Sequence, residues 1–135
     1  MITRHILPGF PPSASPSPHA VEVDGWVYLT GQFPRDIDNP AAPLPNGITA
    51  QTQATLRNMA RVLAALGLGF ENLVSMRVFL AEFERDYAAM NEAYAAIIPA
   101  DARPARTCVG VQAIVRGALV EMDCVARRLS QGEVR

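Results

Sequence analysis

The sequence predicts an α+β fold with one mixed β-sheet and two helices packed on one face, in the order β-β-α-β-α-β-β. Three observations predict this arrangement. Apolar and polar residues alternate in the segments expected to be strands, two segments carry apolar residues at helical spacing, and each helical segment lies between strands that right-handed crossovers can join. Both helices should therefore cover the same face of the sheet.

The chain begins with an irregular arm that is followed by a hairpin. Residues 8–18 hold five prolines and three serines, a composition that favours irregular structure. Residues 20–23 and 26–31 are rich in β-branched and aromatic residues, and Asp24-Gly25 between them is a strong hairpin signal. Residues 33–47 contain four prolines and an Asn-Gly pair, so we expect a long loop there.

Two amphipathic helices follow. Residues 49–67 carry apolar side chains at helical spacing, and Gly67 stands where a glycine ends a helix; the apolar positions are Leu56, Met59, Leu63 and Leu66. Residues 82–98 carry a second apolar stripe before Pro99 ends the helix, formed by Tyr87, Met90, Tyr94 and Ile97.

The strand between the helices alternates over residues 73–80 and leaves one sheet face uncovered. Its helix-facing set is expected to be Val74, Met76, Val78 and Leu80. The opposite face then includes Tyr28, Thr30, Arg77 and Phe79. A half-apolar sheet face that nothing in the chain covers predicts self-association.

The last two strands, residues 105–113 and 118–126, are expected to pair as a hairpin through residues 115–117. Pairing their apolar sets on the helix-covered face places four side chains on the opposite face: Arg106, Cys108, Glu121 and Asp123. Two interpretations of this cluster remain open. It is either a network of ion pairs that seals an oligomer, or a site where Arg106 binds a small carboxylate and Glu121 orients or deprotonates a water.

Composition narrows the functional classes. The 135 residues suit one domain spanning 1–135, and a net charge of -1 provides no general attraction for nucleic acid. We expect a cytoplasmic protein, because no segment reads as a signal peptide or membrane span. His5 and His19 have no partners at ligand spacing, so no metal site is expected. Cys108 and Cys124 should lie on opposite faces as reduced thiols.

Five short motifs, in order along the chain, add a family resemblance. They are Y-L-T-G-Q-F-P at 28–34, a Gln-Thr helix start at 51–52 with Leu-Gly at its end, N-E-A-Y at 91–94, R-P-A-R-T-C-V at 103–109 and G-A-L-V-E-M at 117–122. These motifs resemble those of the reactive-intermediate deaminase (RidA/YjgF) family, also called the endoribonuclease L-PSP family. The resemblance covers residues 16–128.

The resemblance implies a chorismate-mutase-like fold assembled as a homotrimer, with clefts between subunits. It implies an enamine/imine deaminase, a hydrolase of C=N bonds like 2-iminobutanoate/2-iminopropanoate deaminase, which forms 2-keto acids and ammonia without a cofactor. As catalytic residues, Arg106 would hold the substrate carboxylate and Glu121 would position the attacking water. The thiol of Cys108 is not required as a nucleophile. The implied substrate-binding residues are Arg106, Thr30, Cys108, Ser17 and Asn91.

The arm departs from the family pattern. Where the family has P-Y-S-Q-A, this chain has P-S-P-H-A at 16–20, so that Ser17 replaces a pocket tyrosine and His19 replaces a glutamine. Thr30 replaces a more usual serine and keeps the hydroxyl. Loss of the tyrosine predicts a wider cleft, so the sequence does not identify the substrate. His19 is expected to face solvent from the arm.

Three other functions compete with a deaminase of small imino acids. One is a trimer that binds small carboxylate metabolites without catalysis. Another is a deaminase of a longer substrate such as 2-aminomuconate, which a wider cleft would suit. The third, RNA cleavage, is disfavoured by the near-neutral charge and by the lack of basic residues interleaved with aromatic ones. Neither nucleic acid nor a membrane is therefore expected as a partner.

Overall fold

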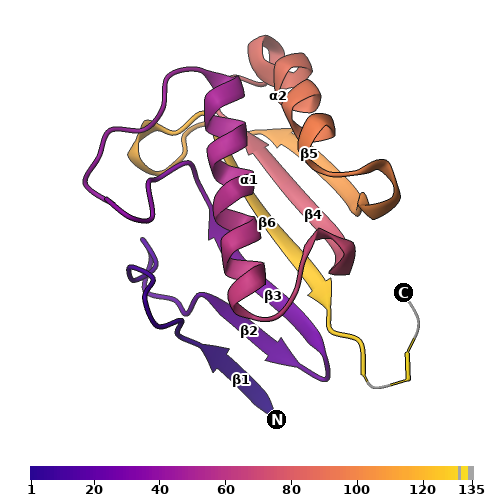
Figure 1. The fold of residues 1–135 in the computed structure, drawn as a ribbon. Helices are drawn as coiled ribbons and strands as arrows, with labels where there is room; N and C mark the ends of the chain where they lie inside the picture. The colour runs from indigo at the N-terminus through magenta and orange to yellow at the C-terminus, as the bar shows by residue number, and fades with distance from the viewer. Residues whose placement is uncertain (131, 134–135) are drawn as a thin grey trace.

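A six-stranded mixed sheet forms the centre of the molecule in the computed structural model, which describes residues 1–130 and 132–133. Figure 1 shows the sheet with both helices in front of it. The strand order is β1-β2-β3-β6-β4-β5, with only β4 and β5 parallel. The strands are β1 (Ile2–His5), β2 (Ala20–Val23), β3 (Trp26–Gln32), β4 (Leu73–Leu80), β5 (Ala105–Gly110) and β6 (Val120–Arg127).

The predicted α+β class is confirmed, with one strand added at the start of the chain. β1 pairs antiparallel with β2 at the edge of the sheet. Four residues with exposed Ile2 and Arg4 give no apolar alternation, so the sequence pattern carries no strand signal there. The predicted hairpin of β2 and β3 is confirmed, and Asp24 and Gly25 at its turn both have positive φ.

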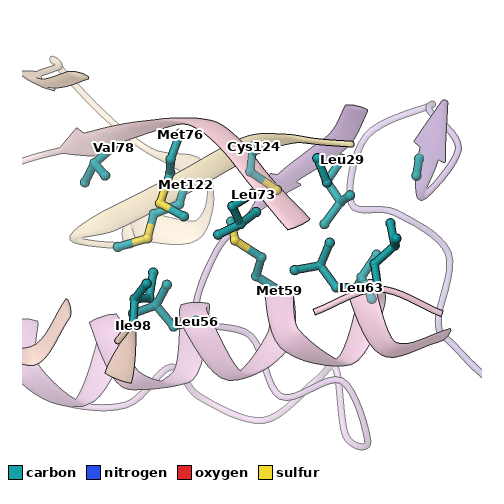
Figure 2. Close-up of a cluster of buried hydrophobic side chains, with 14 of the residues drawn as sticks. Leu29, Leu56, Met59, Leu63, Leu73, Met76, Val78, Ile98, Met122 and Cys124 are labelled. Carbon is teal, nitrogen blue, oxygen red and sulfur yellow. The ribbon is translucent and has the colours of Figure 1, made fainter. Parts of the chain in front are cut away.

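Both helices pack on one face of the sheet. They are α1 (Ile48–Ala65) and α2 (Phe83–Ile97), and Gly67 follows α1 with φ 75° and donates its N–H to the Ala64 carbonyl, as predicted for a helix end. Figure 2 shows the core between α1 and the sheet, where Leu56, Met59 and Leu63 meet the strands. Within the described residues, no helix is long and apolar enough to cross a membrane.

Two apolar positions differ from the predicted pattern. Val74 is 41% exposed, because the pairing of β4 with β6 is irregular between Leu73 and Ser75, and Leu73 is buried in its place. Tyr87 is also exposed and stacks on Phe83 at 4.7 Å between ring centroids, outside the core stripe of α2.

The predicted hairpin of the last two strands is wrong. β5 pairs in parallel with β4 at the sheet edge, whereas β6 lies between β3 and β4. The predicted strand to residue 113 ends at Gly110, where the chain leaves the sheet edge and crosses to β6. The face assigned to the β5 side chains therefore changes as well.

No helix or strand in the described part of the chain covers the face opposite the two helices, as predicted. Tyr28 is 46% exposed and Val109 42% exposed on this face, next to half-buried Phe79. Arg77 and Asp123 form an exposed ion pair there, with 2.6 Å between Nη2 and Oδ2. The face therefore combines aromatic and aliphatic side chains with one paired charge, a composition suited to contact with another protein surface.

Candidate functional site

Arg106 faces α2, not the uncovered side of the sheet. In the parallel register Arg106 is the partner of Met76, whose buried side chain points toward the helices. The Nη2 atom of Arg106 donates a hydrogen bond to Asn91 Oδ1 at 2.7 Å, and the Cζ atom of Arg106 lies 4.8 Å from the centroid of the Tyr94 ring. Asn91 and Tyr94 are three residues apart in α2, a spacing that puts both on one side of the helix. The sequence prediction of the opposite face is therefore wrong for Arg106.

The Arg106 guanidinium has no acidic partner in the part of the chain that the structure describes. A neutral amide oxygen and an aromatic face hold it in place instead, and neither neutralises its charge. Among the described residues, the nearby Tyr94 hydroxyl is buried without a hydrogen-bond partner. This cluster therefore offers a half-buried cation and an unused polar group to an anionic ligand.

Cys108 lies on the same face as Arg106, two residues along β5. It is the register partner of Val78 and packs against the core, so its predicted position on the uncovered face is wrong too. Burial raises the pKa of its thiol, an effect that the Arg106 charge opposes. Cys124 also faces the helices, as Figure 2 shows, so the two free thiols are not on opposite faces. A thiol with a raised pKa is a poor nucleophile near neutral pH.

Glu121 lies on the other side of the sheet, as predicted, and lines a pocket of about 170 Å³. Thr30, Gly31, Arg35 and Ser15 also line this pocket. Burial raises the pKa of the Glu121 carboxyl, and the charge of Asp123 raises it further. Among the described residues, Glu121 has neither a hydrogen bond nor an ion pair, so its carboxyl group is available to a ligand or to water.

The irregular end of β3 makes room for Glu121. The pairing of β3 with β6 shifts between Leu29 and Gln32, and Gly31 lies in this stretch. A Cβ atom on Gly31 would lie 2.6 Å from Glu121 Oε2, closer than ordinary contact. The absence of a side chain at Gly31 therefore lets the carboxyl group lie against the strand.

Thr30 and His19 connect this pocket to the N-terminal arm. Thr30 Oγ1 donates to the Pro18 carbonyl at 2.6 Å. His19 is 6% exposed, which contradicts the expected solvent-facing position. Its Nδ1 accepts the Leu7 N–H at 2.9 Å, and its Nε2 lies 2.8 Å from the Pro11 carbonyl, a pattern that the Nε2-protonated tautomer satisfies. His19 therefore fixes the path of the irregular residues before β2.

Ser17 lies near the pocket but does not line it. Its hydroxyl contacts the Ser15 hydroxyl at 2.6 Å on the outer side of the arm. Ser13 and Ser15 line the Glu121 pocket instead. The position at which the family resemblance implies a pocket tyrosine therefore lies outside the Glu121 pocket of the single chain.

The structure divides the predicted site residues other than Ser17 into two groups. Arg106, Asn91 and Cys108 meet between β5 and α2, whereas Thr30 and Glu121 meet on the opposite sheet face. Sequence reasoning assigned Tyr94 to the core alone and assigned no role to Arg35. The three-residue spacing from Asn91 could have placed Tyr94 at the site, but no local pattern marks Arg35, which lies in the long loop.

Comparison with known proteins assigns the chain to a family. A family model described as Endoribonuclease L-PSP matches residues 10–128. The chain is 34% identical to the 3-aminoacrylate deaminase RutC of Acinetobacter baylyi, over 90% of this chain and 94% of the relative. It is 32% identical to the 2-iminobutanoate/2-iminopropanoate deaminase of Mus musculus, over 86% and 84%. The chain belongs to the RidA/YjgF family.

Solved structures of RidA/YjgF proteins and their relatives share the fold. Yeast Mmf1 superposes with a TM-score of 0.85 at 29% identity, covering 96% of this chain and all of the other. YyfA of Yersinia pestis, a protein of the Rid family, superposes with a TM-score of 0.85 at 28% identity, covering 94% and 99%. The sheet and helices of this chain therefore have the architecture of the RidA/YjgF family, as the sequence motifs implied.

Proposed function

We propose that this protein is an enamine/imine deaminase that hydrolyses small 2-imino acids to 2-keto acids and ammonia, and that it works as a homotrimer with its sites between subunits. The names of the mouse and Acinetobacter relatives support the reaction class. One observation carries the proposal for the site. Among the residues that the structure describes, Arg106 is a cation without an acidic partner and Glu121 is a carboxyl group without a basic one, and the two lie on opposite faces of one sheet.

A site formed between two subunits would allow Arg106 of one subunit and Glu121 of the other to contact the same substrate. In one chain the sheet separates Arg106 from Glu121, so both cannot contact the same small substrate. The uncovered face that carries Glu121 also carries exposed Tyr28 and Val109, which an adjacent subunit would bury. A neighbour that brings its β5 edge to this face would place its Arg106 near the Glu121 pocket.

The chemistry needs no covalent intermediate. Arg106 binds the substrate carboxylate through its planar guanidinium and fixes the imine carbon in place. Glu121 takes a proton from water as the oxygen adds to the carbon of the protonated imine, forming a neutral carbinolamine. It then gives this proton to the nitrogen as the C–N bond breaks and ammonia leaves, and the Glu121 carboxylate accepts the hydroxyl proton as the C=O bond of the keto acid forms. Burial raises the pKa of the Glu121 carboxyl, a direction that favours this exchange of protons.

Subunit complementation tests the proposal. Arg106→Met and Glu121→Gln variants should each lose hydrolysis of freshly generated 2-iminopropanoate, measured by the release of keto acid and ammonia. Mixed oligomers formed from equal amounts of the two variants should regain activity, because about a quarter of inter-subunit sites would pair an intact Arg106 with an intact Glu121. Size-exclusion chromatography with light scattering should show a trimer.

Three results would contradict the proposal. Mixed oligomers as inactive as their parents would exclude a site that takes one residue from each subunit. Saturable keto-acid binding without turnover of any imino acid would instead favour a non-catalytic binder. RNA cleavage that persisted through purification and vanished in Arg106→Met would favour a nuclease, although a net charge of -1 offers little attraction for RNA.

A further inference from the structure

The Glu121 pocket contains a cation of its own, Arg35, in the loop that follows β3. The side chain of buried Asn58, in α1, holds the backbone at Arg35 in place. It donates hydrogen bonds to the carbonyls of Phe33 and Arg35 at 3.0 and 2.8 Å. The Arg35 guanidinium donates through Nη1 to the Pro12 carbonyl at 3.0 Å and lies 5.7 Å from the Phe33 ring centroid. Within the described residues, the other guanidinium donors make no hydrogen bond and are left for a ligand.

The charge of Arg35 has no counterion in the described part of the chain. The adjacent Asp36 turns away, since its Oδ1 accepts the backbone N–H groups of Asp38 and Asn39. Burial lowers the pKa of Arg35, and the like charge of Arg116 lowers it further. A half-buried cation next to another cation is unfavourable until an anion binds. Five other arginines are ion-paired: Arg61, Arg77, Arg85, Arg127 and Arg128.

Arg35 and Glu121 line the same pocket without pairing, since no ion pair joins them within 4.0 Å. A ligand can therefore contact both groups at once. Phe33, which also lines the pocket, provides an apolar wall that a short aliphatic chain can contact.

From this arrangement we infer that the substrate carries a second acidic group, a carboxylate at the end of its side chain, which Arg35 binds. The inference rests on the proposed deaminase function and adds the substrate class: dicarboxylic imino acids in preference to monocarboxylic ones. Arg106 would bind the carboxylate next to the imine carbon, and Arg35 would bind the distal one. Such a charge-assisted contact changes affinity by about 10- to 100-fold.

Two substrates and three variants test the inference. Imino acids are generated in situ by amino-acid oxidases from alanine, a monocarboxylate precursor, and from glutamate, a dicarboxylate precursor. The wild type should have a higher kcat/KM for the dicarboxylic imine. Arg35→Met should lower that value by about 10- to 100-fold and leave the monocarboxylic value within about twofold, whereas Arg35→Lys should recover part of the loss. Arg4→Gln, at an exposed arginine of β1, should change neither value.

The two-substrate comparison separates binding of the distal carboxylate from a structural role of Arg35 through Pro12. An equal loss for both substrates, or no loss in Arg35→Met, would overturn the inference while leaving the deaminase function intact. If no imino acid is hydrolysed, calorimetry with 2-oxoglutarate and 2-oxobutanoate replaces the kinetic assay. Tighter binding of 2-oxoglutarate than of 2-oxobutanoate, lost in Arg35→Met, would support the dicarboxylate site although the deaminase proposal fails. Equal binding of the two keto acids would overturn the inference of a dicarboxylate site.

Discussion

Replacing Gly31 by alanine should displace the Glu121 carboxyl group while the backbone of β3 stays in place. The new Cβ atom would lie 2.6 Å from Oε2 and 3.3 Å from Cδ, whereas ordinary contact begins at 3.4 Å. The carboxyl oxygen must therefore move by about 0.8 Å. Gly31 is not among the glycines with positive φ, so alanine can adopt its backbone conformation.

The two consequences of this change differ in size. Moving the end of a flexible glutamate costs about 0.5–1.5 kcal/mol, and the reduced entropy of the unfolded chain returns about 0.4–1 kcal/mol, so the free energy of unfolding should change little. A misplacement of about 1 Å in a catalytic group can reduce the rate by about 100-fold. We therefore expect Gly31→Ala to lose about 10- to 100-fold in kcat at a nearly unchanged Tm.

Steady-state kinetics with 2-iminopropanoate and calorimetric unfolding measure the two quantities. A double-mutant cycle supplies the control, because Gly31→Ala should have no further effect once Glu121→Ala has removed the carboxyl group. Retention of kcat within about twofold would show that the position of Glu121 does not limit the rate. A loss of kcat equal in both backgrounds would show that alanine acts elsewhere in the pocket.

Three further predictions follow from single contacts. Arg106→Lys removes the planar fork, so kcat/KM should fall by about 10- to 100-fold in steady-state kinetics; an unchanged value would exclude paired hydrogen bonds to the substrate. Asn58→Leu removes two hydrogen bonds from the loop carbonyls and should lower the free energy of unfolding by about 2–4 kcal/mol in urea titrations, whereas a change below about 0.5 kcal/mol would refute their role. Burial raises the pKa of Cys124 from 9.0 to about 12, so the unfolded state loses the thiol proton first and stability should fall by about 1.4 kcal/mol per pH unit as pH rises from 9 toward 12. Cys124→Ala should lessen that fall in urea titrations at each pH, and an identical slope would contradict the assignment.

Local signals in the sequence were sufficient to predict most of the helices, strands and turns. Asp24 and Gly25 predicted the hairpin turn, and Gly67 predicted the end of α1, because these conformations depend on one or two residues. The uncovered face was predictable from alternation and from the number of helices. β1 was missed because a short edge strand has no buried side to produce alternation.

The site required information that alternation does not contain. Alternation tells which residues of a strand share a face, but not which strand lies beside it. The short connection before β6 suggested a hairpin of β5 and β6. Instead, β5 follows the α2 crossover and pairs in parallel with β4, and in this register Arg106 faces Tyr94. Glu121 was placed on the right face because β6 has two neighbours and a clear buried side. Arg35 could not be found from a pattern, since loops have no periodicity.

The central place of β6 has a consequence for synthesis on the ribosome. β6 joins β3 to β4, and the pair at one end of its ladder with β3 links Trp26 to Arg127, about a hundred residues apart in the chain. Until residues 120–127 emerge, the three N-terminal strands and the β4-α2-β5 unit each present an open strand edge. The nascent chain must therefore keep two unsatisfied edges from pairing with other chains, and the sheet closes in a single late step.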